Sequence, residues 1–193
     1  MNLKKRKIKK AIPLPLLLIT IFIIYFGFSI PGLAIDEYAL KSTIIFRICK
    51  YTQWPQNPDK NKPFTISILG KTTPVKEIKV PWEKIDNRRV IIRKIRNLSQ
   101  IKDSEVLFIA SSEAYRIDSI LDYIGNKPVL TVGDTRGFGE QGVIINLYIH
   151  NDSIGFEINY DASKKAKLQI HSQLYAIGRL IRTKKPFQED IEN

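Results

Sequence analysis

Residues 106–124 read VLFIASSEAYRIDSILDYI, and this stretch decides the fold class. Its first five residues, Val106 to Ala110, form a continuous apolar run, which is typical of a central strand covered on both faces. Apolar residues then recur at helical spacing from Ile117 to Ile124, and Gly125 follows as a stop signal. The stretch therefore predicts a buried strand followed by a helix, which is the repeating unit of α/β folds.

Further strand and helix patterns flank this unit. Helical spacing over 36–53 predicts a helix whose apolar face carries Leu40, Ile44, Ile48 and Tyr51. Strands are expected at 64–69, 89–95 and 128–132, and the arms of a hairpin at 143–149 and 154–160, around a turn at 150–153. Residues 71–86 are ambiguous, with a short helix ending before Pro81 as one interpretation.

The C-terminal pattern predicts a last helix after residue 172. Leu174, Ile177 and Ile181 are spaced for its apolar side, and Ser172 is expected to be its N-cap. Arg179, Arg182, Lys184 and Lys185 would suit the dipole at its C-terminal end. Asp161 is expected to cap a short basic turn before it. Strands alternating with helices, then a hairpin and a helix, predict one compact α/β domain with a mixed sheet and helices on both faces.

The N-terminus has the pattern of an export signal. Basic residues at 4–10 precede a long apolar run at 11–30, and Pro31-Gly32-Leu33-Ala34 places small residues as a signal peptidase requires. We expect cleavage after Ala34, with an uncleaved membrane anchor as the alternative because the apolar run approaches the length that spans a bilayer. Either way the basic cluster keeps the N-terminus inside and the domain outside the cytoplasm. The expected organisation is a signal peptide or anchor (1–34), an α/β domain (35–186) and a loose acidic tail (187–193).

Charge and cysteine content disfavour several classes of function. The formal net charge is +12, but much of it belongs to the N-terminal cluster, and the remaining basic residues are scattered. A nucleic-acid partner is therefore not expected, because duplex binders concentrate basic residues in a stripe. The single cysteine, Cys49, excludes an intrachain disulfide and a thiolate metal cluster, and its apolar neighbours predict a buried core residue.

Motifs for catalysis or cofactor binding are weak. Residues 137–142 match G-x-G-x-x-G, but a hairpin is expected after them where dinucleotide binding needs a helix, so we interpret them as a tight glycine loop. His150 lies in a predicted turn, and His171 precedes the last helix as a capping or ligand-facing residue. We expect no enzyme, no cofactor and no metal site, and an exported hydrolase is the least favoured alternative.

Several stretches, taken in order, resemble the YfiR family of exported bacterial proteins. They are EYALK (37–41), KYTQWP (50–55), PFTISILG (63–70), NRRVIIR (87–93), SEVLFIASSE (104–113), LTVGD (130–134), GVIINL (142–147) and FEIN (156–159). The resemblance runs from about Asp36 to Ile181. It implies a compact Rossmann-like domain in the periplasm, often dimeric, that represses an inner-membrane diguanylate cyclase through its periplasmic region. Release by a signal or by an outer-membrane lipoprotein would then raise cyclic-di-GMP and promote biofilm formation.

Two departures from the family pattern change what is expected. Ser104 stands where the family has a cysteine before the central strand, so control by a disulfide should be absent. Gln141-Gly142-Val143 replaces the usual Gly-Gly-Met before the hairpin, which predicts a different loop surface.

Two functional hypotheses follow from this reading. The first is a regulator that binds a membrane signalling protein, such as a diguanylate cyclase or a sensor kinase. The second is a periplasmic module that binds a small molecule and has no link to cyclase control. Expected contact residues are the aromatic anchors Tyr51, Trp54 and Tyr115 and the polar groups Gln53, Gln169 and His171, provided that the two turns carrying the polar groups meet.

Overall fold

The computed structural model describes residues 37–55, 59, 61–71, 84–150 and 153–184. All of them belong to the second of two compact units, Asp36–Asn193. The expected cleavage site at Ala34, the pattern at 72–83, turn residues 151–152 and the acidic tail lie outside the described residues, so those predictions stay predictions. No helix within the described ranges is long and apolar enough to cross a membrane.

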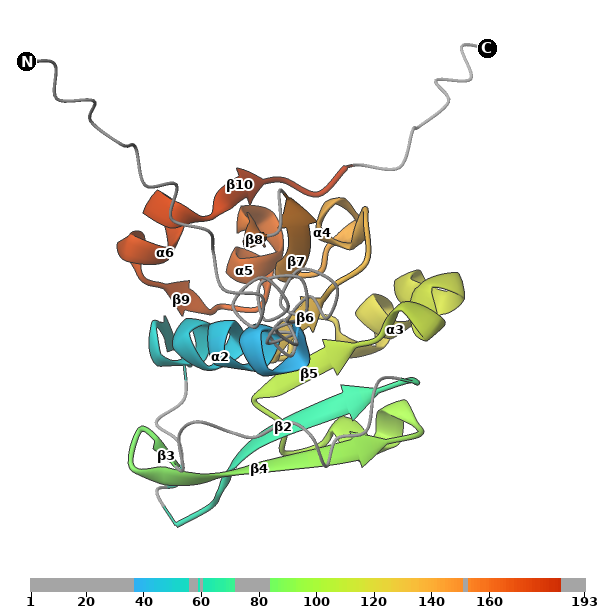
Figure 1. Ribbon diagram of the computed structural model, residues 1–193. Helices are drawn as coiled ribbons and strands as arrows, with labels where there is room; N and C mark the ends of the chain where they lie inside the picture. Colours follow the sequence, from blue (N-terminus) through green and yellow to red (C-terminus); the bar gives the residue numbers. More distant parts are fainter. Residues whose placement is uncertain (1–36, 56–58, 60, 72–83, 151–152, 185–193) are drawn as a thin grey trace, which may run out of the picture. The chain divides into compact units, whose positions relative to one another are not determined.

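Eight strands form one mixed sheet in the described part of the chain (Figure 1). Their spatial order is β10-β8-β7-β6-β5-β2-β4-β3, in which β4, β2, β5, β6 and β7 run parallel. Strand β3 is antiparallel to β4, and β8 is antiparallel to β7 but parallel to β10. The strands are β2 (Phe64–Leu69), β3 (Lys84–Ile85), β4 (Arg88–Ile95), β5 (Val106–Ile109), β6 (Leu130–Gly133), β7 (Ile145–His150), β8 (Ser153–Asn159) and β10 (Arg179–Ile181). The predicted α/β fold with a mixed sheet is confirmed.

Helices cover both faces of this sheet. The buried apolar residues accordingly form two separate clusters. One cluster includes residues of α2 (Glu37–Lys50), α5 (Tyr160–Lys165) and α6 (Ser172–Ile177). The other includes residues of α3 (Ile117–Ile124), α4 (Phe138–Gln141) and the 3-10 helix η2 (Leu98–Ile101). A second 3-10 helix, η3 (Ser111–Arg116), leads from β5 into α3.

The central strands β2 and β5 lie where the sequence predicts them. All four residues of β5 are buried, as its continuous apolar run requires. Every residue of β2 is buried as well, although Thr65 and Ser67 gave that segment an alternating pattern. Ser67 tolerates burial because its hydroxyl hydrogen-bonds to the hydroxyl of Ser104 (2.7 Å).

The first helix differs from its prediction in both length and buried face. It ends at Lys50, and Gln53 belongs instead to the short strand β1 (Thr52–Gln53). Leu40 and Tyr51 are 37% and 42% exposed, whereas Phe46 and Cys49 are buried beside Ile48. Apolar residues surround much of this helix, so its sequence supports more than one buried face, and tertiary packing selects among them.

The C-terminal segment departs most from the prediction. Helix α6 ends at Ile177, and Arg179–Ile181 form the edge strand β10, parallel to β8. The side chain of His171, and not that of Ser172, caps α6 by accepting a hydrogen bond from the backbone N–H of Gln173 (3.3 Å). The three residues of β10 form hydrogen bonds with β8, which helix propensity alone does not predict. Ile177, expected on the apolar side of the helix, is 75% exposed.

Two local predictions near the hairpin also change. The glycine loop contains the one-turn helix α4, bounded by Gly137 and Gly142 with φ of 88° and 116°. Both positions therefore need the left-handed backbone that glycine supplies. Asn159 caps α5, because its side chain accepts a hydrogen bond from the N–H of Ala162 (2.9 Å), whereas Asp161 binds Arg182 (2.7 Å).

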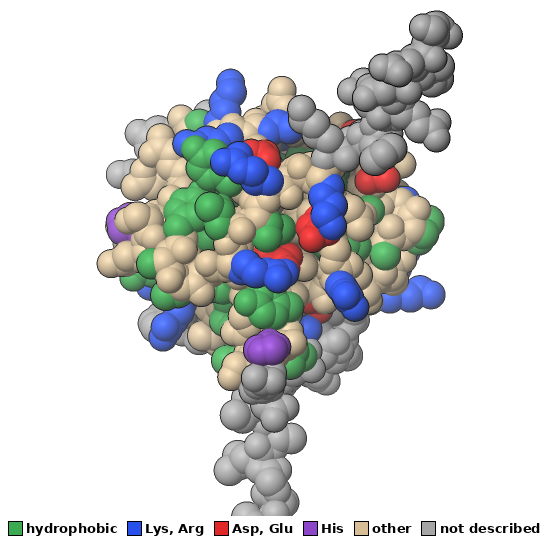
Figure 2. Space-filling model, turned by 90° about the horizontal axis from the view of Figure 1, so that it is seen from above, with side chains coloured by type: hydrophobic (Ala, Val, Ile, Leu, Met, Phe, Trp, Pro, Cys, Tyr) green, Lys and Arg blue, Asp and Glu red, His purple; other side chains and the backbone are tan. Residues whose placement is uncertain are grey.

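Basic side chains on the face near β10 are dispersed. β10 lies along the top of Figure 1, and Figure 2, seen from that side, shows Lys and Arg side chains apart from one another with acidic groups beside several of them. Residues of β10 and the segment after it form ion pairs with acidic partners: Arg179 with Glu157, Arg182 with Asp161, and Lys184 with Glu140.

Cys49 is fully buried on α2, and this burial raises the pKa of its thiol. We expect a thiol reagent at pH 8 to label the native protein at least about a hundredfold more slowly than the urea-unfolded chain, because labelling requires opening. Since the folded pKa is raised, the neutral thiol favours folding below the ordinary thiol pKa, and that advantage is lost as the pH rises above it. Cys49→Ala should remove this alkaline component of the unfolding free energy. Equal labelling rates for native and unfolded protein would contradict the burial.

Candidate binding site

The two turns that carry the predicted polar contacts meet in the fold. β1 pairs antiparallel with β9 (Gln169–Ile170), and the register places Gln53 opposite Gln169. The N–H of His171 donates to the carbonyl oxygen of Tyr51 (2.8 Å), and the rings of these residues lie 5.8 Å apart between centroids. The side chains of Tyr51, Gln53, Gln169 and His171 are all exposed. We call this group the β1–β9 cluster.

Buried contacts beneath the β1–β9 cluster hold it in place. The Thr52 side chain is 3% exposed, and its hydroxyl donates to the carbonyl oxygen of Ile48 in the last turn of α2 (2.8 Å). His171 Nδ1 accepts the hydrogen bond that caps α6, so the neutral imidazole carries its proton on Nε2 and offers that N–H to a partner. The cluster is therefore exposed but fixed to two helices.

Trp54 lies beside the cluster and is half-buried. Its ring packs edge-on against Phe64, with ring centroids 5.4 Å apart and an interplanar angle of 87°. Its indole Nε1 is buried and has no hydrogen-bond partner among the described residues. Trp54 and Gln53 also line a groove of about 1310 Å³, which runs past the N-terminal ends of strands β2 and β5. An unpaired indole N–H beside an open groove is a donor that a bound molecule could satisfy.

An ion pair forms the wall of this groove. Arg88 is only 4% exposed and pairs with Glu105. Its guanidinium also donates to the carbonyl oxygens of Lys62 (2.8 Å) and Pro63 (2.7 Å), while Glu105 Oε2 accepts from the N–H of Thr65 (2.7 Å). The positive charge of Arg88 is thus paired with Glu105, and its side chain forms part of the groove wall. Sequence reasoning missed this pair, because no local pattern links the two positions.

Arg93 supports the groove in the same way. Its guanidinium donates to the Ser67 hydroxyl (3.0 Å), the Ser104 hydroxyl (3.1 Å) and the carbonyl oxygens of Gln100 (2.9 Å) and Lys102 (2.6 Å). Ser104 occupies the position where the resemblance expects a cysteine. Its hydroxyl takes part in this polar network through Ser67 and Arg93.

Tyr115 lies apart from the other predicted contacts. It is 81% exposed on η3, beyond the end of β5, whereas Trp54 packs against Phe64 at the beginning of the parallel strand β2. The nearby guanidinium of Arg116 lies 5.8 Å from the centre of its ring. The predicted aromatic contacts Trp54 and Tyr115 therefore lie at opposite ends of the central strands.

Two kinds of site are absent from the described residues: a group of metal ligands, and a histidine hydrogen-bonded to a hydroxyl or thiol. Among them, no group of three or more His, Cys, Asp or Glu side chains could bind a metal ion. Of the hydrogen bonds between described residues, none joins His150 or His171 to a hydroxyl or thiol side chain that could act as a nucleophile.

Comparison with known proteins places this domain in a family. A family model described as YfiR/HmsC-like matches residues 38–179. None of the curated proteins matches the chain.

Three solved structures align with this chain at low sequence identity. A conserved domain protein from Vibrio cholerae aligns at 11% identity over 77% of this chain and 60% of its own, with a TM-score of 0.50. An ABC domain from Streptococcus pneumonia in complex with L-Trp aligns at 12% identity over 61% and 56%, with a TM-score of 0.48. A ligand-free substrate-binding protein with adhesive properties from Clostridium difficile aligns at 13% identity over 65% and 56%, with a TM-score of 0.46. This chain thus spans less than two thirds of each of these proteins, and the likeness concerns the fold alone.

Proposed function

This chain belongs to the YfiR/HmsC-like family, and from that membership we infer that it restrains a membrane signalling protein, such as a diguanylate cyclase, by binding the periplasmic region of that protein. The family consists of periplasmic regulators of cyclic-di-GMP signalling and is not catalytic. To this general role of the family we add a specific action, which is repression, and a class of partner, which is a signalling protein of the inner membrane.

The β1–β9 cluster supports this proposal best. It gathers an exposed tyrosine, two glutamines and a histidine on one rigid junction, beside the half-buried Trp54. Aromatic side chains fixed on a scaffold are common anchors of protein interfaces, because little side-chain entropy is lost when they bind. We propose Tyr51, Trp54 and His171 as the contacts at this junction, and Tyr115 as a separate contact at the other end of the sheet.

Regulation requires two states of the protein that differ in affinity for the target. A repressor shifts the cyclase only to the extent that it binds the inactive form more tightly than the active form. We propose that a signal, or capture by an outer-membrane lipoprotein, lowers the amount of free regulator. Homodimer formation and cleavage after Ala34, with an uncleaved membrane anchor as the alternative to cleavage, are further parts of this proposal.

A second function is favoured by one observation. The Trp54 Nε1 group is buried beside the groove of about 1310 Å³ and has no hydrogen-bond partner among the residues that the structure describes. Ligand sites combine apolar walls with a few fixed polar groups, and this groove supplies Phe64 and Tyr123 as well as Gln53. The alternative is therefore a periplasmic sensory module that binds a small molecule independently of any cyclase.

The experiment that separates these functions is affinity capture of the tagged full-length protein from its own membranes. Recovery of a membrane cyclase or sensor kinase supports the repressor. Recovery of the domain alone, carrying a small molecule that mass spectrometry identifies, supports the sensory module and removes the repressor mechanism.

Substituting residues of the β1–β9 cluster tests whether it is the interface. Tyr51→Ala combined with His171→Ala is expected to weaken target binding at least about tenfold, since hot-spot truncations cost more than about 1 kcal/mol each. The free energy of unfolding should fall by no more than about 0.5–2 kcal/mol, because both side chains are exposed and only the His171 cap of α6 is lost. Binding is measured by surface plasmon resonance on the purified periplasmic region of the captured partner.

Ile149→Ala is the control, since that side chain is 56% exposed and lies outside the cluster. If the control and the cluster variant bind equally well, the junction is not the interface.

A further inference from the structure

A second groove, separate from the β1–β9 cluster, lies between α3, α4 and α5. Its volume is about 820 Å³, within the range of roughly 300–1,000 Å³ that is usual for small-molecule sites. Leu121, Ile144 and Ala162 give it apolar lining, and the almost fully buried Thr131 also lines it. This inference is independent of the function proposed above.

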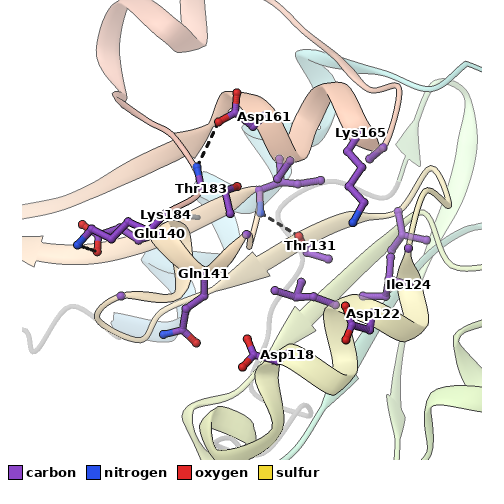
Figure 3. A pocket seen from close by; sticks show the side chains of 18 residues that line it. Asp118, Asp122, Ile124, Thr131, Glu140, Gln141, Asp161, Lys165, Thr183 and Lys184 are labelled. Atoms are coloured by element: carbon purple, nitrogen blue, oxygen red, sulfur yellow. Dashed lines mark hydrogen bonds and ion pairs between the residues drawn. The ribbon is translucent and has the colours of Figure 1, made fainter. Parts of the chain in front are cut away.

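Unpaired charges of opposite sign line this groove. Asp118 and Asp122 come from α3, and Lys165 comes from α5. Figure 3 shows Asp118 and Gln141 pointing toward one another, while Lys165 reaches from α5 toward the strand that carries Thr131. Among the described residues, none forms a hydrogen bond or ion pair with the side chains of Asp118, Asp122 or Lys165. The other charged residues of the groove are already paired, Glu140 with Lys184 and Asp161 with Arg182.

The two aspartates on α3 are electrostatically unfavourable as they stand. They lie four residues apart on one helix, where like charges repel. Asp118 is in the first turn, where the helix dipole favours a carboxylate, but Asp122 is in the last turn, where the dipole disfavours one. Within α3 no basic residue occupies the last turn, but Lys127, beyond the helix, donates to the carbonyl oxygen of Tyr123 (3.0 Å). Since both aspartates are exposed, the destabilisation that remains is small. A cation placed beside both carboxylates would remove these two unfavourable effects.

We propose that this groove binds a small zwitterion with an apolar body. The cationic group would lie against Asp118 and Asp122, the anionic group would lie against Lys165, and the apolar body would cover Leu121 and Ile144. An apolar lining between opposite charges favours such a molecule over a simple cation, which Lys165 repels, and over an anion, which the two aspartates repel.

The test compares three probes of equal chain length by isothermal titration calorimetry on the purified full-length protein in low salt. They are aminooctanoate with its amine on the terminal carbon, octylamine and octanoate. We expect aminooctanoate to bind most tightly. Asp118→Asn combined with Asp122→Asn should weaken it about tenfold or more, and Lys165→Met should weaken it by a similar factor, since tenfold corresponds to about 1.4 kcal/mol. Lys165→Met should instead strengthen the binding of octylamine.

Asp103→Asn is the control, because Asp103 is exposed on another part of the surface and its left-handed backbone suits asparagine. It should leave every affinity unchanged. The proposal is overturned if Lys165→Met leaves aminooctanoate binding unaltered, if octylamine binds wild-type protein as tightly as aminooctanoate does, or if no probe binds. Circular dichroism of each variant confirms that a lost affinity is not lost folding.

Discussion

Arg88→Met is expected to lower the free energy of unfolding by about 3–5 kcal/mol, because it leaves a largely buried carboxylate without its partner. Arg88 links three elements, since it binds Glu105 before β5 and the carbonyl oxygens of Lys62 and Pro63 before β2. A loss of this size is a large fraction of the roughly 5–15 kcal/mol that stabilises a typical domain. Urea unfolding should show a lower midpoint with an unchanged slope.

Two further variants isolate the cause of this loss. Arg89→Met is the matched control, because the neighbouring side chain is exposed, and we expect a change within about 0.5 kcal/mol. Combining Arg88→Met with Glu105→Met should recover part of the loss, since a buried ion pair replaced by apolar groups is often neutral. Equal effects of the Arg88 and Arg89 substitutions would show that the ion pair does not stabilise the fold.

Phe138→Ala is expected to cost about 3–5 kcal/mol, the usual range for truncating a buried phenylalanine. The side chain is 1% exposed although it belongs to the one-turn helix α4, and it joins the cluster beneath α3. Its ring lies against Gly133 so closely that a Cβ added there would be 2.6 Å from Phe138 Cδ2. The glycine at the end of β6 therefore makes room for the ring.

A double-mutant cycle tests this fit. Gly133→Ala alone should cost about 1–3 kcal/mol through overpacking, but much less in the Phe138→Ala background, where the space is free. Thermal or urea unfolding of the four proteins gives the coupling energy. Strictly additive losses would mean that the ring and the glycine do not share this space.

The sequence predicted the parts of the fold that local patterns determine. The run at β5, the alternation of β7 and β8, and the spacing of α3 each carry enough apolar residues to specify one structure. β10 was missed because Arg179–Ile181 continue the helical spacing of α6, and only pairing with β8 makes a strand of them. β1 and β9 have two residues each, which is too short for any periodic signal.

In the candidate sites too, the sequence identified single residues, but only the tertiary structure shows which of them lie together. Gln53 and Gln169 were named from separate turns, and their meeting depended on tertiary structure that the sequence could not supply. Tyr115 resembled Tyr51 as an exposed aromatic, yet topology places it beyond the opposite end of the central strands. The groove between α3, α4 and α5 could not be predicted from the sequence, since Asp118, Asp122 and Lys165 have the pattern of ordinary solvated charges on helix surfaces.

The contacts of α2 have a consequence for the order in which the chain can fold. This first helix binds late segments: Lys41 pairs with Asp134, 93 residues further along, and the strand after the helix pairs with Gln169–Ile170. Contacts so distant along the chain form slowly, over milliseconds to seconds. A chain that emerges N-terminus first therefore cannot complete the packing around α2 until its last quarter appears. During synthesis these contacts of α2 and β1 can thus form only when the C-terminal segment arrives.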